Sequence, residues 1–372
     1  MKIGLITDSL DYQAAGIGRY IRNLVTNLTK VDRKNEYVLI HEKEIDDELY
    51  RGHIQHIVIP SPHVPLGREL RKITLGRALR QYNFDVVHDL AQVGPFFSAQ
   101  PYVAIETIYD LSPMRYPQFV TTANRWRNTI GVRLILNNLD AIITISETSK
   151  REIVEQYHVD ARKIHVTTLA HDPERFHPLE LDSQNNQDFL KRYHIDTPYF
   201  LFVGTIEPRK NLTTLIAAFN DYRHGGSMAQ LFIIGRLGWK YQAIEQAMKT
   251  SPFADDIRWL AKVEDIDLPF FYANARALIF PSWHEGFGLP VVEAMACRCP
   301  IICSDIPVIR EIAGPAALYF DPHRHELCTE AMRTVNTEVK RGDLIAARDI
   351  EIQKYSWERC ARQTLKVYEQ YS

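Results

Sequence analysis

The chain of 372 residues has few cysteines and almost no net charge. Its 5 cysteines, a small and odd number, argue against a disulfide framework and favour a reducing compartment. Because 44 basic side chains stand against 46 acidic ones, the chain lacks both the basic excess of a nucleic-acid-binding protein and an acidic tail. We therefore expect no nucleic-acid partner, and any anionic ligand must be held by a local group of cations.

Long apolar runs and a leader segment are also lacking. The uncharged stretch 90–105 is too short to span a bilayer and is broken by Pro95 and Pro101. At the amino terminus, Lys2 is followed by an apolar run that stops at Asp8, without the longer hydrophobic region of a secretory signal. These absences predict a cytoplasmic protein with no transmembrane helix.

One cysteine cluster could be taken for a metal site. Cys297, Cys299 and Cys303 lie close together in the sequence, but they flank the apolar run 300–302 and have no histidine at zinc spacing. Buried free thiols are common in protein cores. We therefore expect these cysteines to be core residues and predict no metal ion there.

The chain has ordinary globular composition, 45% hydrophobic and 24% charged, and its short apolar runs alternate with helical patterns. This alternation is typical of βαβ units on parallel sheets, and so of the α/β class. The polar stretch 180–187 indicates a surface linker, and Ser356 is suited to cap a helix from Trp357 towards Tyr368. We predict two doubly wound domains, whose strands comprise residues 3–7, 37–41, 85–88, 103–107, 141–145 and 164–168 in the first, and 199–203, 230–234, 257–261, 277–280 and 301–303 in the second.

Open parallel sheets bind ligands at the carboxyl ends of their strands, so the loops after each strand are examined first. The loop after the first strand contains Gly16 and Gly18 ahead of an expected helix, and their backbone N–H groups could approach a phosphate. Ile21 stands where a dinucleotide fingerprint requires a third glycine or alanine, so a nicotinamide cofactor is weakly supported. A flexible turn and a phosphate-facing loop remain equally good interpretations.

A stronger signal follows the first strand of the second domain. There Gly204 and Thr205 lead to the adjacent cations Arg209 and Lys210 at the end of a buried strand. Two charges at such a place call for an anion, and a diphosphate would neutralise both. The alternative is a pair of solvated surface charges on a loop.

The loop after residues 277–280 is the most informative. Gly286 and Gly288 let the backbone approach a ligand, and Pro290 suits the first turn of the following helix. Glu285 lies in this loop and Glu293 lies within the helix, so two carboxylates flank the anion site and can accept hydroxyl donors. A nucleotide sugar, with hydroxyls on both sides of a diphosphate, satisfies all these groups. Glu293 taken alone could instead serve the electrostatics of the helix amino terminus.

Glu285, seven intervening residues and Glu293, together with the Arg209-Lys210 loop, resemble the retaining family 4 glycosyltransferases of the GT-B fold. The resemblance covers nearly the whole chain, and segments 204–211 and 235–239 are similar to bacterial mannosyltransferases of surface polysaccharides. It implies two Rossmann-like domains facing across a cleft, an acceptor-side domain 1–175 and a donor-binding domain 176–355, with the final helix 356–372 crossing back to the first domain.

The resemblance also implies roles for individual residues. Glu285 and the amides of Phe287 and Gly288 would hold the sugar hydroxyls. The Leu289 N–H would hold the diphosphate together with Arg209 and Lys210. Glu293 would hold the ribose, and the backbone near Val263 would face the base.

Two departures from the family pattern concern catalysis. Many relatives have an arginine where this chain has Thr205, so Arg209 must supply the guanidinium. Many also have a His-Asp pair where this chain has Tyr109 and Asp110, and a neutral tyrosine is a poor base. Either Tyr109 only contacts the sugar, or the donor phosphate takes the acceptor proton. His88 is an alternative site residue, although a histidine at a strand end is more often structural.

The reaction that follows is transfer of a sugar, with mannose from GDP-mannose favoured, to a glycan or lipid-linked acceptor in polysaccharide biosynthesis. The resemblance implies that the anomeric configuration is retained. Positive groups aimed at the diphosphate stabilise the leaving group, so we expect neither a metal ion nor a cofactor. A nucleotide-sugar epimerase or hydrolase and a non-catalytic sugar-nucleotide-binding subunit are the alternatives.

Two basic segments of the first domain predict contact with an anionic membrane surface. Segment 111–139 combines four arginines with Tyr116, Phe119 and Trp126 and has no acidic residue, whereas segment 66–82 contains a single acid, Glu69. Several such cations could hold the protein reversibly, and we expect the attachment to be electrostatic. An ordinary solvated basic face is the equally weighted alternative. The cations are Arg68, Arg71, Lys72, Arg77, Arg80, Arg115, Arg125, Arg127 and Arg133.

Overall fold

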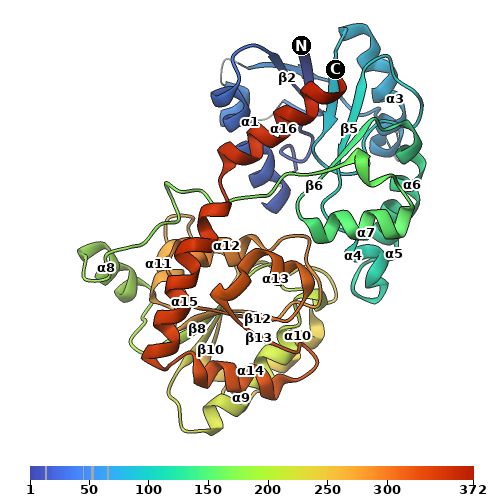
Figure 1. Cartoon of the computed structure of the whole chain (residues 1–372). Coiled ribbons are helices and arrows are strands. Elements are labelled where there is room, and N and C mark those ends of the chain that lie inside the picture. The colour runs from blue at the N-terminus through green and yellow to red at the C-terminus, as the bar shows by residue number, and fades with distance from the viewer. Residues whose placement is uncertain (13–14, 45, 52–53, 65–66) are drawn as a thin grey trace. The chain divides into compact units, whose positions relative to one another are not determined.

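The computed structural model describes residues 1–12, 15–44, 46–51, 54–64 and 67–372, which form two compact units (Figure 1). Unit 1 comprises Met1–Pro117, Thr122–Leu169 and Ser356–Ser372, and unit 2 comprises Gln118–Thr121 and Ala170–Tyr355. The chain leaves unit 1 after Leu169. The boundary predicted from the sequence lies six residues later, at residue 175. Each unit contains one parallel sheet flanked by helices.

Unit 1 has a seven-stranded sheet in the order β3-β2-β1-β4-β5-β6-β7, with every pair parallel. Because β1 and β4 are neighbours at the centre, the order reverses between them. The strands are β1 Lys2–Ile6, β2 Glu36–His41, β3 Gln55–Val58, β4 Val86–Asp89, β5 Val103–Thr107, β6 Ala141–Thr144 and β7 Ile164–Val166. The helices are α1 Ala15–Val31, α2 Glu48–Arg51, α3 Gly67–Ala78, α4 Ser112–Arg115, α5 Thr122–Trp126, α6 Val132–Ile135, α7 Glu147–Tyr157 and α16 Trp357–Tyr371.

Unit 2 has a six-stranded parallel sheet in the order β10-β9-β8-β11-β12-β13, which reverses between β8 and β11. The strands are β8 Tyr199–Val203, β9 Gln230–Ile234, β10 Ile257–Leu260, β11 Ala277–Phe280, β12 Ile301–Ser304 and β13 Ala317–Phe320. The helices are α8 Gln184–Arg192, α9 Leu212–His224, α10 Gln242–Lys249, α11 Leu268–Asn274, α12 Leu289–Ala296, α13 Pro307–Ala313, α14 His325–Thr334 and α15 Glu338–Glu351. The α/β class and the two doubly wound sheets are confirmed.

The predicted strands all form, and two edge strands, β3 and β13, were not predicted. Gln55 and His56 of β3 are exposed, so this strand lacks the apolar run that identifies a buried one. The prediction of a linker over 180–187 was wrong at its end, because α8 begins at Gln184. The Ser183 side chain caps α8 by accepting from the Asn186 N–H, and Phe189 is buried against Phe271.

The last helix, α16, belongs to unit 1, as the sequence predicted. The Ser356 side chain caps it by accepting from the Arg359 N–H, and the helix packs against α1. In the middle of the sheet, the Tyr368 hydroxyl lies 2.7 Å from His88 Nδ1. One face of α16 is therefore anchored in the core of unit 1.

The expectation that Cys297, Cys299 and Cys303 are core residues is confirmed, because all three are buried free thiols. Burial raises the pKa of the Cys303 thiol well above its usual value. Across the described residues, no helix is both long and apolar enough to cross a bilayer.

Candidate functional site

The site in unit 2 lies where its sheet order reverses, because the loops after β8 and β11 leave neighbouring strands there. Pro208–Lys210 forms a single 3-10 turn after β8, and Asn211 ends it in the left-handed region at φ 54°. The Asn211 side-chain amide donates to the Pro322 carbonyl, which fixes this turn. The Trp283 N–H donates to the Arg209 carbonyl at 2.9 Å, so the two loops are joined by their backbones.

Four charged side chains meet between these loops. Lys210 Nζ lies 2.6 Å from Glu285 Oε1, and Arg209 Nη1 lies 2.8 Å from Glu285 Oε2. Arg209 Nη2 also lies 2.7 Å from Glu207 Oε1, and its Nη1 donates to the His284 carbonyl. Glu207, Lys210 and Glu285 are buried. We call Glu207, Arg209, Lys210 and Glu285 the charge quartet.

The charge quartet is balanced without a ligand. Burial by itself would raise the pKa of Glu285, but the Arg209 and Lys210 cations outweigh it and lower that pKa to about 2. Burial lowers the pKa of Lys210, although the Glu285 carboxylate opposes this shift. Glu285 and Glu207 therefore neutralise Arg209 and Lys210 from within the protein, a pairing that the sequence did not predict. Sequence reasoning assigned no role to Glu207, which precedes Pro208 and is buried at 2% exposure.

The turn before α12 directs backbone N–H groups into the same region. Gly288 has φ +104°, and a Cβ there would lie 2.9 Å from the Ile309 side chain, so this position requires glycine. Pro290 occupies the first turn of α12, as predicted. Among the described residues, no acceptor is present for the backbone N–H groups of Phe287, Gly288 and Leu289. These donors are free to bind an anion or hydroxyl oxygens.

The remaining predicted donor-binding residues of unit 2 lie further along the same edge. Glu293 is buried on α12 and accepts from the Tyr272 hydroxyl at 2.9 Å. Gly204 and Thr205 follow β8, with Thr205 exposed, and the Gly204 N–H donates to the Ile234 carbonyl. Half-buried Val263 follows β10, two strands away from β8 in the sheet.

In unit 1, the glycines after β1 are placed differently from the prediction. Gly16 and Gly18 lie in the first turn of α1, which begins at Ala15, and not in a loop ahead of it. No heavy atom lies within 4 Å of the position of a Cβ at Gly16. The helix turn therefore leaves open space beside Gly16.

Tyr109 and Asp110 both have local partners. The Tyr109 hydroxyl donates to the Leu90 carbonyl, and burial raises the pKa of this phenol well above its usual value. Tyr109 therefore keeps its proton at neutral pH and cannot act as a base. Asp110, two residues before α4 begins, accepts from the Ser112 N–H at 2.9 Å.

His88 has a structural role. It is fully buried, and its Nδ1 and Nε2 each lie 2.7 Å from a hydroxyl, that of Tyr368 and that of Thr107. Burial lowers the pKa of His88 to about 3, so the ring is neutral. With both ring nitrogens occupied, His88 is not free to exchange a proton with a substrate.

The sequence analysis did not single out three acidic residues at the carboxyl edge of the unit 1 sheet. Glu106 and Asp89 are buried beside each other, and burial raises the pKa of both. Glu106 accepts from the Gly94 N–H at 3.0 Å. Asp8 pairs with buried Arg71, and its pKa rises to about 6 because burial outweighs that pairing. Each of them lies at or near the carboxyl end of a strand, and this position could have identified them from the sequence.

The sequence contains an Asp-x-Asp pair, Asp265 and Asp267, of the kind that holds a divalent ion in some glycosyltransferases. Asp265 pairs with Arg175 at 3.0 Å, and Asp267 accepts from Arg192 at 3.0 Å and from the Tyr193 hydroxyl at 2.8 Å. Both carboxylates are thus engaged by protein donors. Within the described ranges, no group of three or more potential ligands forms a metal site.

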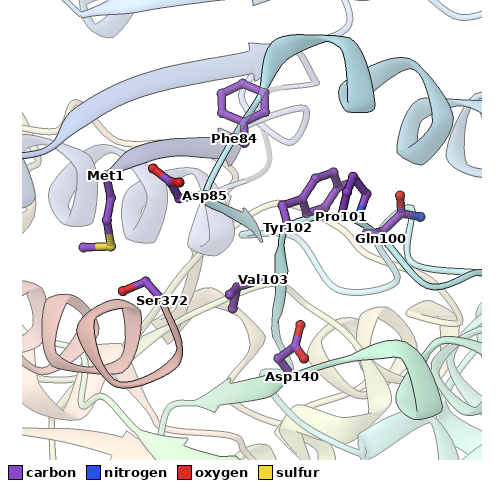
Figure 2. A pocket seen from close by; sticks show the side chains of 9 residues that line it. All are labelled: Met1, Phe84, Asp85, Gln100, Pro101, Tyr102, Val103, Asp140 and Ser372. Atoms are coloured by element: carbon purple, nitrogen blue, oxygen red, sulfur yellow. The ribbon is translucent and has the colours of Figure 1, made fainter.

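A hollow of about 570 Å³ opens at the other edge of the unit 1 sheet, where its strands begin (Figure 2). Asp85 and Asp140 line it together with Tyr102. Asp85 accepts from the Lys2 N–H and Asp140 from the Ala104 N–H, so both carboxylates hold the strand ends together. This hollow is separate from the loops that carry the predicted site residues.

Two family models match the chain, "Glycosyltransferase Family 4" over residues 14–175 and "Glycosyl transferases group 1" over residues 185–343. The O-antigen chain mannosyltransferase B of Escherichia coli is 29% identical over 386 aligned residues, which cover 99% of each chain. The O-antigen chain mannosyltransferase RfbU of Salmonella typhimurium is 29% identical over 62% of this chain and 60% of its own.

Solved structures share the fold at lower identity. Sucrose-phosphate synthase from Thermosynechococcus elongatus has a TM-score of 0.80 at 19% identity, with 100% of this chain and 98% of that one covered. Anabaena HepE in complex with UDP and glucose has a TM-score of 0.78 at 16% identity, with 99% of each chain covered. The two family models, the full-length similarity and this fold together show that the chain is a GT-B glycosyltransferase belonging to family 4.

Proposed function

We propose that this glycosyltransferase moves mannose from GDP-mannose to a hydroxyl of a glycan or lipid-linked acceptor, with retention of configuration and without a metal ion. The similarity to O-antigen mannosyltransferases supports the sugar and the pathway class. The observation that carries the proposal is the charge quartet beside the three free N–H groups before α12. Together they offer donors for a diphosphate and a carboxylate for sugar hydroxyls.

Donor binding would rearrange the charge quartet. The diphosphate competes with Glu285 for Arg209 and Lys210, because both anions need the same N–H donors. Once the diphosphate has taken its place beside Arg209 and Lys210, the Glu285 carboxylate accepts hydrogen bonds from the sugar hydroxyls. Glu207 keeps Arg209 in place. The free N–H of Leu289 adds a further donor to the diphosphate, while Glu293 accepts from the ribose.

In the proposed reaction, the bond between the anomeric carbon and the phosphate oxygen breaks while the acceptor oxygen bonds to the same face of that carbon. The acceptor proton moves to the departing phosphate oxygen, so no protein base is needed. This agrees with the raised pKa of Tyr109. Arg209 and Lys210 stabilise the negative charge that develops on the leaving group, which is commonly the largest catalytic contribution.

The donor is tested by a thermal-shift screen of nucleoside diphosphates, with GDP expected to give the largest stabilisation. Transfer is then tested by incubating GDP-mannose with and without acceptor glycans and identifying the products. GDP release that depends on acceptor, with an α-linked product from the α-linked donor, supports the proposal. Rapid hydrolysis or epimer formation without acceptor would favour the epimerase or hydrolase alternative.

A non-catalytic sugar-nucleotide-binding subunit is the remaining alternative. All of the charged donor residues that the family resemblance names, Glu285, Arg209, Lys210 and Glu293, are present, which disfavours it. Nucleotide binding without product under any donor and acceptor combination would favour it. We also propose that the protein acts in the cytoplasm, since its five cysteines are buried free thiols.

A further inference from the structure

Three large apolar side chains form an exposed row on unit 1. Trp126, Ile130 and Leu134 are 60%, 43% and 58% exposed. They are spaced four residues apart along α5, the π-helical turn Arg127–Gly131 and α6, so successive members lie about one turn apart on one face. The other face of α6 contributes Val132 and Ile135 to the core.

A second exposed apolar pair lies on the adjacent helix α3. Leu70 and Ile73 are exposed there, whereas Leu75 and Leu79 after them enter the same core cluster as α6. Figure 1 shows α3, α5 and α6 along one side of the unit 1 sheet. We call the exposed residues of α3, α5 and α6 the α3–α6 surface.

The loop between β4 and β5, which contains Val93, contacts both α3 and the π-helical turn before α6. Lys72 of α3 donates to the Val93 carbonyl at 2.9 Å, and the Val93 side chain packs against Gly131. Both exposed rows thus border one segment of unit 1. Exposed large apolar side chains that gather in this way mark an interaction site more often than scattered single residues do.

The charge on the α3–α6 surface is positive. Arg77, Arg125 and Arg133 are exposed, and none has a hydrogen bond or ion pair within the described part of the chain. The segment 111–139 has no acidic residue. Arginines beside exposed tryptophan and leucine match a surface with negative headgroups above an apolar layer.

The structure removes two cations from the set that the sequence analysis assigned to a membrane surface. Arg71 is buried in its ion pair with Asp8, and Arg115 pairs with Glu152 and Glu155. The side chains of Arg68 and Arg127 lie outside the described residues. Fewer cations than expected are therefore available for electrostatic attachment. Burial of the exposed apolar row would add to the free energy of binding.

We propose that the α3–α6 surface docks on an anionic phospholipid leaflet, with Trp126, Ile130 and Leu134 inserted among the headgroups and the arginines bound to phosphates. Reversible anchoring of this kind needs two signals, a cluster of cations and buried apolar area, and this surface has both. The inference rests on unit 1 alone and is independent of the proposed reaction.

Vesicle sedimentation tests the proposal with phosphatidylcholine vesicles that contain or lack phosphatidylglycerol. The wild type is expected to bind only the anionic vesicles. The apolar variant Trp126→Ser with Leu134→Ser should bind at least about tenfold more weakly and stay salt-sensitive, because its buried apolar area is lost. The charge variant Arg125→Glu with Arg133→Glu should also lose at least about tenfold.

The matched control is Met228→Ser with Ile350→Ser, which removes two similarly exposed apolar side chains from unit 2. Its vesicle binding should equal that of the wild type. In the wild type, quenching of tryptophan fluorescence by brominated lipids should report insertion, and Trp126→Ser should remove most of that quenching. Transfer to a short water-soluble acceptor should be unchanged in every variant, which separates this inference from the proposed reaction.

Three results would overturn the inference. The first is equal recovery of the wild type in the supernatant with both kinds of vesicle. The second is unchanged binding of the apolar variant. The third is self-association of the wild type, measured by sedimentation velocity without lipid and lost in the apolar variant, which would identify the α3–α6 surface as a contact between copies of the chain.

Discussion

The carboxyl edges of the two sheets share one topology but differ in chemistry. In unit 2, the loops after β8 and β11 present Arg209 and Lys210 beside free backbone N–H groups. In unit 1, the strand ends present Asp8, Asp89 and Glu106, whose pKa values are all raised by burial. The first edge suits an anion, whereas the second is acidic, with Asp89 and Glu106 buried inside the protein. A doubly wound sheet thus provides the position of a site, and the loop side chains decide its ligand.

The largest expected effect comes from removing a cation of the unit 2 edge. Lys210→Ala should lower kcat by on the order of 10²-fold or more, by analogy with the loss of one donor to a developing anion. Lys249→Ala is the matched control, because its exposed pair with Glu245 contributes little. Steady-state transfer assays compare the two, and a nearly unchanged kcat for Lys210→Ala would contradict the role of the charge quartet.

The second prediction separates sugar binding from nucleotide binding. Glu285→Gln should lower transfer on a similar scale, on the order of 10²-fold, because a neutral amide no longer orients the sugar through charged hydrogen bonds. Affinity for GDP should be kept or increased, since Arg209 and Lys210 then lack their carboxylate partner. Calorimetric titration with GDP measures this, and loss of GDP binding by the folded variant would refute the proposed role.

Glu207 should have a smaller effect because it acts through Arg209. Glu207→Gln weakens one of the contacts that hold the guanidinium, while the contact with the His284 carbonyl remains. We expect a loss of about tenfold in kcat/KM, mostly in kcat. Recovery of activity in Glu207→Asp would support a positioning role. An effect as large as that of Lys210→Ala would place Glu207 in contact with the substrate.

A further prediction concerns the unit 1 edge, where no protein base is expected. Tyr109→Phe removes the hydroxyl that donates to Leu90 and should lower kcat by less than about tenfold, an effect well below that of a general base. The pH profile of kcat should keep its shape. A drop of about a thousandfold, together with loss of an acidic limb from that profile, would show that Tyr109 acts as the base.

The smallest effect concerns stability and not catalysis. The pKa of His88 is about 3 in the fold against 6.5 in the unfolded chain, so the unfolded chain binds the proton first as pH falls. His88 therefore lowers the free energy of unfolding by up to about 1.4 kcal/mol per pH unit between these two values on acidification. Urea titrations across this range should show a shallower slope for His88→Gln. An unchanged slope would mean that other groups control acid unfolding.

Much of the fold follows from local patterns in the sequence. Residues 199–203 and 277–280 are continuous apolar runs because both faces of a parallel strand are covered, and such runs are easy to find. The edge strand β3 is covered less and begins with the polar residues Gln55 and His56, so it was missed. The same holds for α8, where a polar helix with one buried phenylalanine, Phe189, resembles a linker.

The site was found in part for the same reason. Glycines, a proline and charges directly after a strand are local signals, and they identified Gly288, Pro290, Arg209 and Lys210. Spacing along the chain carries no information on which charges meet, so the pairing of Lys210 with Glu285, 75 residues away, was not predicted. The roles of Glu207 and His88 were likewise set by burial, which depends on segments distant in sequence.

The sequence by itself determined the α/β class, the two sheets and the family, and it indicated the loops of the candidate site, because each of these depends on residues close together in the chain. Only the tertiary structure decided the charge state of those residues. It placed Glu285 between two cations, buried His88 against α16 and left Trp126, Ile130 and Leu134 exposed in one row. Solvation and charge pairing act through space, so these properties appear only when distant segments come together.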